Sequence, residues 1–392
     1  MSVQSLNGPL RVLFVESGTE LGGPQIALLT MLRAIDRRQI LPFYASLGFG
    51  NGNLPEQIES LSIPVFRLRP GRFRDLPATF SGIAALRRHI QRHEIDLVFS
   101  NGGHANLFAR PAAVLTGRPC VWWVHGYFPT DPIKGYLIAL GEQLLSADCM
   151  FANSEWTARE LRADFNSAPP VRVVKYGIEL ARFASSPEAG RAARQALDLG
   201  TDDLVVALFG RLHPFKGQHI FLQAAIHVAA SVPSCRFLLI GGTPFQLAPE
   251  YAAGLRRQAE RSGLNGRIRF LGHRPDVHLL YSACDIVVHA SVEPEPWGLV
   301  VSEAMAAGRA VIAAAAGGPS EMIEDGRTGR LVPPGDVFGL AAAITSLALN
   351  PGKRAALGAA ARDHAGEQFD HLRAAQVMAA ELRRVASEAG KG

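Results

Sequence analysis

The chain has 392 residues, of which 48% are hydrophobic and 19% are charged. This balance is typical of a well-packed α/β protein and differs from that of a disordered chain. The length exceeds what one hydrophobic core usually supports, so we expect two large domains. The net charge of +5 at pH 7 comes mostly from arginine, a side chain well suited to binding phosphate groups. We expect no nucleic-acid partner.

The cysteine pattern indicates a reducing compartment. The cysteines are scattered, include no Cys-x-x-Cys pair and have no histidines at zinc spacing, which favours buried thiols; they are Cys120, Cys149, Cys235 and Cys284. The N-terminus lacks the features of a signal peptide, and no run of about 18 apolar residues is long enough to span a membrane. We therefore expect a cytoplasmic protein.

An arginine-rich segment leaves peripheral membrane association open. Arg67, Arg69, Arg72 and Arg74 are interleaved with apolar residues. Basic groups near anionic lipid contribute about 1 kcal/mol each to membrane binding. A solvated surface is the simpler interpretation, so contact with the inner face of an anionic membrane stays an alternative.

Alternating apolar runs and helical patterns predict a first α/β domain over residues 1–180. A short apolar run at residues 11–15, a glycine-rich turn and a helical pattern at residues 26–35 form a β-loop-α opening. Further strand-like runs lie at residues 41–47, 63–68, 95–100, 120–126, 148–154 and 171–177, and helix-like stretches at residues 108–117 and 135–145. This alternation predicts a parallel sheet with helices on both faces.

A second alternating series predicts a second α/β domain over residues 181–370. The pattern weakens after Gly177, and we place the linker in the first part of the charged, alanine-rich segment that follows. Strand-like runs then lie at residues 204–210, 235–242, 267–272, 284–291, 309–318 and 329–336, with closing helices at residues 351–368 and 372–390. Residues 371–392 form a C-terminal helix that could pack back on the N-terminal domain. The expected fold is two doubly wound, Rossmann-like domains facing across a cleft, with ligands near the strands' carboxyl ends.

Basic residues follow the first strand of this second domain. Gly210 and Arg211 end the strand, and Lys216 with Gly217 begins the next helix. A guanidinium and an ammonium beside a helix N-terminus form a suitable site for a diphosphate. A basic surface loop without function is the alternative interpretation of these residues alone.

Two glutamates bracket a tryptophan-glycine pair in the same domain. Prolines at positions 294 and 296 disfavour a helix around Glu295, whereas the following residues predict a short helix that contains Glu303. The amides of this helix's start can hold an anion, and the carboxylates can accept hydroxyl hydrogen bonds; the amides belong to Gly298, Leu299 and Val300. Glycoside hydrolysis also uses paired carboxylates, but it gains nothing from a phosphate site beside them.

A second glycine pair, Gly317-Gly318, precedes another short helical pattern. We expect this helix to offer a further N-terminus to the same ligand.

These motifs together resemble the donor-binding half of the retaining GT-B glycosyltransferases of family 4. The matching stretches are "GRLHPFKG", "EPWGLVVSE" and "GGPSEMIEDGRTGRLVPPGD". The resemblance implies that Arg211 and Lys216 hold the donor diphosphate, that Glu303 binds the ribose, and that Glu295 faces the transferred sugar. It also implies that the nucleobase lies near residues 271–277, which include Gly272, His273 and Arg274.

The first half shares the resemblance less specifically. It implies an acceptor-side loop at Gly22-Gly23 and a catalytic role for His125, whose family counterpart approaches the donor sugar. A satisfied core histidine is the alternative for His125 taken alone. Tyr176 and Glu179 stand where the family commonly has Asn and Asp, which puts the local interdomain contact in doubt.

The expected activity is transfer of a sugar, with retained configuration, from a nucleoside-diphosphate sugar to a hydroxyl acceptor. The acceptor could be a glycan, as in polysaccharide biosynthesis, a lipid-linked sugar or a small molecule. No Asp-x-Asp motif indicates a metal, so we expect no metal or other cofactor, with Arg211 and Lys216 stabilising the leaving diphosphate. A GT-B sugar-nucleotide epimerase and a catalytically silent nucleotide-sugar-binding module stay as alternatives. A nicotinamide enzyme is disfavoured because no Gly-x-Gly-x-x-Gly follows a strand.

Overall fold

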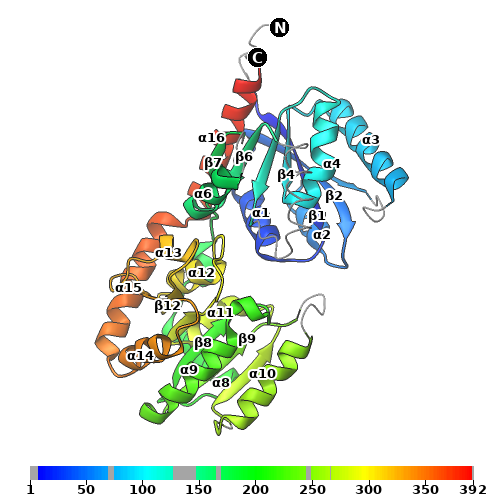
Figure 1. The fold of residues 1–392 in the computed structure, drawn as a ribbon. Coiled ribbons are helices and arrows are strands. Elements are labelled where there is room, and N and C mark those ends of the chain that lie inside the picture. Colours follow the sequence, from blue (N-terminus) through cyan, green and yellow to red (C-terminus); the bar gives the residue numbers. More distant parts are fainter. Residues whose placement is uncertain are drawn as a thin grey trace. The chain divides into compact units, whose positions relative to one another are not determined.

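A computed structural model describes residues 8–68, 75–126, 147–164, 169–243, 249–264 and 266–390. The chain forms two compact units (Figure 1). Unit 1 comprises Met1–Gly177 together with His371–Gly392, and unit 2 comprises Ile178–Asp370. The helix expected at residues 135–145 lies outside the described residues. Each unit is a parallel sheet with helices on both faces, so the expected pair of Rossmann-like domains is confirmed.

Unit 1 contains a seven-stranded parallel sheet with the strand order β3-β2-β1-β4-β5-β6-β7. Every residue of the two strands β4 and β5 is buried, as expected for strands that helices cover on both faces. The order reverses between β1 and β4, which makes their carboxyl ends the topological switch point. The strands are β1 (Leu10–Gly18), β2 (Ile40–Phe49), β3 (Val65–Arg67), β4 (Leu97–Asn101), β5 (Cys120–Val124), β6 (Cys149–Ala152) and β7 (Val171–Val173).

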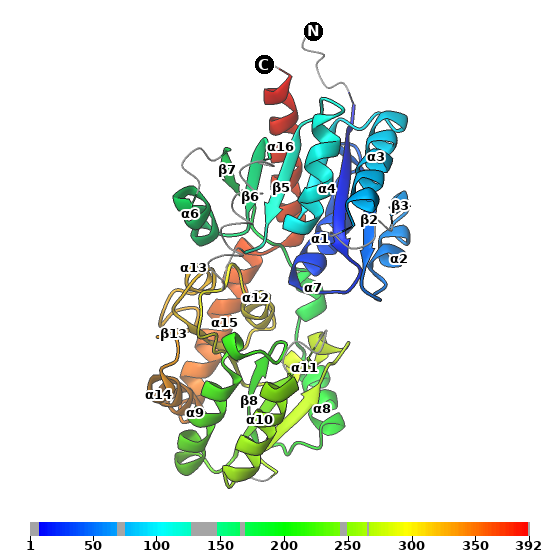
Figure 2. The same cartoon turned by 45° about the vertical axis from the view of Figure 1, so that its right-hand side comes forward.

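The helices of unit 1 flank this sheet in Figure 2. Two of them begin earlier than the apolar periodicity predicts. Helix α1 starts at Gly23 because Pro24, in its first turn, has a backbone suited to helix starts. Helix α4 starts at Gly103, after Gly102 with its φ of 92°. The helices are α1 (Gly23–Ala34), α2 (Leu54–Glu59), α3 (Leu76–Arg92), α4 (Gly103–Val114), α6 (Glu155–Asp164) and α16 (His371–Ala389).

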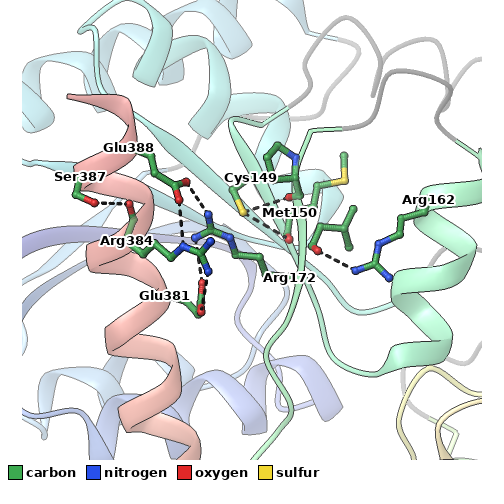
Figure 3. Close-up of polar contacts among 10 residues, drawn as sticks. Cys149, Met150, Arg162, Arg172, Glu381, Arg384, Ser387 and Glu388 are labelled. Carbon is green, nitrogen blue, oxygen red and sulfur yellow. Dashed lines mark hydrogen bonds and ion pairs between the residues drawn. The ribbon is translucent and has the colours of Figure 1, made fainter. Parts of the chain in front are cut away.

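The C-terminal helix α16 belongs to unit 1. A stripe that includes Ala375, Met378 and Leu382 is buried, with the spacing of one helix face. Ion pairs add a polar connection: the Arg172 guanidinium on β7 lies 3.0 Å from the Glu381 carboxylate and 2.6 Å from that of Glu388 (Figure 3). The helix is therefore an integral part of the N-terminal unit, although its residues come last in the chain.

The chain passes from one unit to the other at two places. It leaves unit 1 after Gly177, close to the boundary expected after residue 180, and returns at His371. Within unit 1, a Cβ atom on Gly177 would lie 2.4 Å from the His371 Cα, so only glycine fits there. Within unit 2, the Ile178 amide donates to the Phe369 carbonyl at 2.8 Å.

Unit 2 contains a six-stranded parallel sheet with the strand order β10-β9-β8-β11-β12-β13. The order reverses between β8 and β11, so the switch point of this unit lies where these two strands end. The strands are β8 (Leu204–Phe209), β9 (Cys235–Ile240), β10 (Ile268–Gly272), β11 (Ile286–His289), β12 (Ala310–Ala314) and β13 (Arg330–Val332).

The linker expected after Gly177 is helical, which corrects the prediction. Ser186 caps α8 by accepting a hydrogen bond from the Ala189 amide at 3.1 Å. None of the residues of α8 is buried, and its apolar face consists only of small alanines, which explains why the sequence pattern is weak there. The helices of unit 2 are α7 (Leu180–Phe183), α8 (Pro187–Ala196), α9 (Gln218–Ser231), α10 (Pro249–Arg261), α11 (Val277–Ala283), α12 (Leu299–Ala306), α13 (Pro319–Met322), α14 (Val337–Ala348) and α15 (Pro351–Gln368).

Two further expectations have structural counterparts. All four cysteines are buried free thiols, as predicted.

The hypothesis of membrane contact loses one of its four arginines, because the Arg67 guanidinium is paired with the carboxylates of Glu56 and Glu59. Arg69, Arg72 and Arg74 lie outside the described residues. Within the described ranges, no helix combines the length and the apolar character needed to cross a bilayer.

Candidate functional site

The loop after β8 places Lys216 at the switch point of unit 2. This loop contains a short 3-10 turn, Pro214–Lys216, followed by Gly217, which starts α9. Gly217 has a φ of 68°, and a Cβ atom there would lie 1.8 Å from the Ala290 carbonyl oxygen. Glycine is therefore required at this close approach to the end of β11, and it brings Lys216 to the neighbouring strand.

The Lys216 ammonium meets the buried carboxylate of Glu295. Its Nζ lies 2.6 Å from the Glu295 Oε1, and the His289 Nε2 lies 3.0 Å from the same oxygen. The Ser291 hydroxyl also donates to this oxygen. Burial alone would raise the pKa of Glu295, but the charges of Lys216 and His289 hold it well below its ordinary value. Glu295 is thus a carboxylate at neutral pH, fixed by its partners.

The second glycine pair, Gly317-Gly318, contacts the loop that carries Glu295 and positions it. The Gly318 amide donates to the Glu295 carbonyl at 2.7 Å. A Cβ atom on Gly317 would lie 2.1 Å from that same carbonyl oxygen. The amides of Gly318, Ser320 and Glu321 all have carbonyl partners, and Pro319 has none to offer. The prediction of a second anion site at this helix start is therefore wrong.

Helix α12 begins where the sequence predicts. Its N-cap is Gly298, whose missing side chain leaves the first amides without a side-chain cap. Glu303 accepts a hydrogen bond from the Tyr281 hydroxyl at 2.8 Å, and the Tyr281 ring stacks on Phe209 with centroids 4.1 Å apart. Burial raises the pKa of Glu303 to about 7, against the lowering effect of the Tyr281 hydrogen bond.

The remaining donor-side residues occupy the same edge of the sheet. Arg211 is exposed, with its guanidinium carbon 5.5 Å from the centre of the Phe215 ring. Gly272 ends β10, and its carbonyl accepts from the Gly241 amide at 2.8 Å. His273 follows directly. The Arg274 guanidinium forms two hydrogen bonds with the Asp276 carboxylate, so this arginine is already charge-compensated.

The topology explains why these residues gather. The loops that carry Lys216 and Glu295 follow β8 and β11, which are adjacent in the sheet and flank the reversal of strand order. Ligands of doubly wound sheets bind at this place, outside the carboxyl ends of the strands. An ammonium, a carboxylate and an uncapped helix start are therefore gathered at this edge of unit 2.

A second cluster occupies the corresponding edge of unit 1. The His125 Nε2 lies 2.7 Å from the Asn101 Oδ1, and its Nδ1 lies 2.5 Å from the Tyr176 hydroxyl. Asn101 in turn donates to the Glu16 carboxylate. Burial lowers the pKa of His125 to about 3. The imidazole is neutral at physiological pH, with both of its nitrogens hydrogen-bonded.

Glu16 also holds the expected acceptor-side loop. Its Oε1 accepts from the Gly18 amide at 2.7 Å and from the Gln25 side chain at 3.3 Å. Between these partners lie Gly22, the N-cap of α1, and Gly23, its first residue. Sequence reasoning missed Glu16 and Asn101; the available signal was a polar residue at the end of an otherwise apolar strand.

Profiles of two protein families match this chain, one over each half. The family described as Glycosyl transferases group 1 matches residues 191–364, and Glycosyltransferase Family 4 matches residues 21–182. The fold and the gathered residues define a GT-B glycosyltransferase with two Rossmann-like units.

Curated relatives and a solved structure agree with this class. A D-inositol 3-phosphate glycosyltransferase of Geodermatophilus obscurus is 30% identical, with 97% of this chain and 87% of that protein covered. The corresponding protein of Kribbella flavida is 35% identical over 58% of this chain, and there the chain spans about half of the relative's length, 54%. Anabaena HepE, solved with UDP and glucose, has a TM-score of 0.84 and 28% identity, covering 95% of this chain and 99% of that one. The chain therefore belongs to the group 1 glycosyltransferases of family 4.

Proposed function

We propose that this protein is a retaining hexosyltransferase that moves a sugar from a UDP-sugar to a hydroxyl acceptor without a metal ion. The pairing of Lys216 with the buried Glu295 at the switch point of unit 2 carries the proposal. Structures of Anabaena HepE with UDP and with UDP-glucose support uracil as the base.

The polarity of this pair suits the breaking bond. As the anomeric carbon separates from the diphosphate oxygen, the electron pair goes to the phosphate and positive charge develops on the sugar. Lys216 and Arg211 then stabilise the diphosphate, each contributing about 2–4 kcal/mol by analogy with oxyanion-hole donors. Glu295 faces the sugar, where a carboxylate stabilises the oxocarbenium-like charge.

The donor's other parts are assigned by position. The amides of Gly298, Leu299 and Val300 complete the diphosphate site with Gly210, Glu303 accepts hydrogen bonds from the ribose hydroxyls, and the backbone around Gly272 and His273 holds the base. The departing phosphate oxygen accepts the acceptor's proton on the face that it leaves, so the configuration is retained. His125 takes part as a neutral group. Its ring is held in one orientation because both of its nitrogens already have hydrogen-bond partners.

Two cations beside the leaving group make a metal unnecessary in this scheme. Activity should therefore persist in EDTA. Complete loss that is restored by a divalent ion would overturn the role given to Arg211 and Lys216.

The acceptor binds to unit 1 in this proposal, near Gly22 and Gly23. The curated relatives act on D-inositol 3-phosphate according to their names, so this cyclitol phosphate is the first acceptor to test. Glycan and lipid-linked acceptors follow if it fails. Localisation to the cytoplasmic side of the membrane is part of the same proposal, because nucleotide-sugars are its donors.

One experiment separates the candidate functions. UDP and a panel of UDP-sugars are first tested for thermal stabilisation, since a ligand at about 100 times its Kd stabilises the fold by about 2.7 kcal/mol. Turnover of the best donor is then followed by NMR with and without D-inositol 3-phosphate. Transfer with an α-linked product from an α-linked donor supports the proposal. Donor conversion without any acceptor indicates an epimerase, and binding without turnover indicates a silent module.

A further inference from the structure

Five polar side chains form one continuous chain of hydrogen bonds in unit 1. They lie at or just after the carboxyl ends of β1, β4, β5, β7 and β6, so the hydrogen bonds reach the side chain after β7 before the one after β6, although β6 lies between β5 and β7 in the sheet. The members, which we call the Glu16 relay, are Glu16, Asn101, His125, Tyr176 and Asn153. All but the half-buried His125 are at least nine-tenths buried. Such a chain needs a defined direction, because each buried donor must meet an acceptor.

Glu16 sets that direction. Its oxygens receive hydrogen bonds from the Gly18 amide, the Gln25 side chain and the Ser17 hydroxyl, besides Asn101. Every partner is a donor, so the side chain acts as a carboxylate that only accepts. Asn101 must therefore turn its amide nitrogen toward Glu16, which leaves its oxygen facing His125.

The orientation of Asn101 decides the tautomer of His125. An oxygen opposite the His125 Nε2 at 2.7 Å requires a proton on that nitrogen. In the neutral ring, Nδ1 is then an acceptor, and the Tyr176 hydroxyl must donate to it. All donors in the relay thus point toward Glu16, from the far end at Asn153.

We infer that Glu16 is a positioning residue: through Asn101 it holds His125 as the Nε2–H tautomer, and through Gly18 and Gln25 it fixes the loop that starts α1. One buried carboxylate thereby couples the acceptor-side loop to the histidine. The functional part of this inference rests on the proposed glycosyl transfer, whereas the tautomer is a property of the free protein. Tyr176, which departs from the family's common residue, is the donor that satisfies the remaining ring nitrogen.

An isosteric substitution should reverse the relay. In Glu16→Gln the side-chain oxygen must still accept from the Gly18 amide, so the new amide nitrogen faces Asn101. Asn101 then turns its oxygen to residue 16 and its nitrogen to His125. The ring must accept at Nε2 and carry its proton on Nδ1, the opposite tautomer.

A second substitution should restore the original tautomer. In the double variant Glu16→Gln/Asn101→Asp, the glutamine nitrogen donates to the new carboxylate, which again accepts from the His125 Nε2–H. The negative charge moves from residue 16 to residue 101, while the direction of the hydrogen bonds in the relay is recovered. A purely structural role for Glu16 does not predict this rescue.

The test is NMR of ring carbons and nitrogens in the full-length protein with isotope-labelled histidine, with the His125 signals identified by their loss in His125→Gln. We expect Nε2–H in the wild type, Nδ1–H in Glu16→Gln and Nε2–H in the double variant. An Nδ1–H tautomer in the wild type, or the same tautomer in all three, would overturn the inference.

A matched tyrosine pair keeps the test valid if Glu16→Gln fails to fold. Tyr176→Phe removes the donor to Nδ1, so the Nδ1 resonance should shift while Nε2 keeps its proton. Tyr44→Phe is the control: Tyr44 is buried in the same sheet, and its hydroxyl has no hydrogen-bond partner within the described residues. A change of tautomer in Tyr176→Phe would show that Tyr176, and not Glu16, sets the ring.

Kinetics then test the coupling separately. Glu16→Gln should lower kcat by about 10–100-fold and raise the acceptor KM, the range seen when a group that orients a functional side chain is lost. The UDP Kd, a property of unit 2, should stay within about twofold, below the 0.5 kcal/mol scatter of neutral substitutions. Unchanged kcat and acceptor KM with a reversed tautomer would overturn the coupling. Failure of the proposed function would instead appear as a wild type without transfer, whatever its tautomer.

Discussion

Glu16 in unit 1 and Glu295 in unit 2 are both glutamates in comparable places, yet their pKa values are shifted in opposite directions. Both are buried at the carboxyl-end edge of a parallel sheet. Burial raises the pKa of Glu16, whose partners are neutral amides and a hydroxyl. The pKa of Glu295 is lowered despite burial, because Lys216 and His289 lie against it. A cationic partner therefore decides whether a buried carboxylate resists or favours ionisation.

The difference matches the work proposed for each residue. A carboxylate with a paired ammonium can stabilise charges of both signs as a bond breaks, which suits the donor site. A carboxylate held by neutral donors supplies direction and position without a second charge, which suits a scaffold for the acceptor side. Four predictions test this contrast.

Removing the cation from unit 2 should have the largest effect. Lys216→Ala leaves Glu295 buried without its ammonium partner, so we expect a loss of about 3 kcal/mol in unfolding free energy. Activity should fall by about 10²–10³-fold, as for loss of one oxyanion donor. Urea unfolding and sugar transfer measure the two.

The exposed Lys353 provides a matched control, since Lys353→Ala should change stability by no more than about 0.5 kcal/mol. Adding Glu295→Gln to Lys216→Ala should restore stability and leave activity low. If the double variant is as unstable as Lys216→Ala alone, an unpaired carboxylate is not the cause.

The two glutamates of unit 2 should separate binding from turnover. Glu303→Ala should weaken UDP binding by about 10–100-fold, the value of one or two hydrogen bonds to a charged group. Glu295→Ala should mainly lower kcat, because in the proposed function Glu295 faces the transferred sugar, which UDP lacks. Calorimetry with UDP and steady-state kinetics distinguish these effects, and equal losses of UDP affinity would contradict the assignment.

The pH dependence of UDP binding should report on Glu303. Its pKa of about 7 in the free protein means that it is largely protonated below neutrality, and ribose hydroxyls donate best to the ionised form. UDP affinity should therefore rise with pH up to about pH 7, by at most about tenfold per unit for one linked proton. Glu303→Gln should lose this pH dependence, which separates the titration of Glu303 from that of UDP itself. Equal slopes of UDP affinity against pH in the wild type and in Glu303→Gln would contradict the prediction.

Stability should respond to pH in opposite senses at Glu16 and Glu295. The contribution of Glu295, whose folded pKa is lowered, is present above its unfolded pKa of about 4.5 and lost as pH falls below it. The contribution of Glu16, whose folded pKa is raised, is present at low pH and lost as pH rises through the folded value. Urea unfolding of Glu16→Gln and Glu295→Gln from well below pH 4.5 up to pH 8 measures both contributions, and slopes of the same sign would refute the contrast.

Much of the donor-side arrangement could be predicted from the sequence because it is local. Lys216 stands beside Gly217, and Glu295 just before Gly298, so strand ends and a helix start are visible in consecutive residues. The relay could not be predicted, because Glu16 and Asn101 meet through strand pairing between β1 and β4, and apolar patterns do not specify strand order. The misassigned Gly317-Gly318 pair shows the same limit: the Gly318 amide donates to the Glu295 carbonyl, which lies on a different loop.

The placement of α16 has a consequence for how this protein is made. Unit 2 is one uninterrupted segment, so the ribosome releases everything it requires before the chain ends. Most of unit 1 is synthesised first, but it lacks α16, whose Met378 and Leu382 are buried and whose Glu381 pairs with Arg172, until residues 371–389 emerge. During synthesis, which adds about 5–20 residues per second, the earlier half must therefore wait more than ten seconds for its last helix. The second half should then complete its folding before the first.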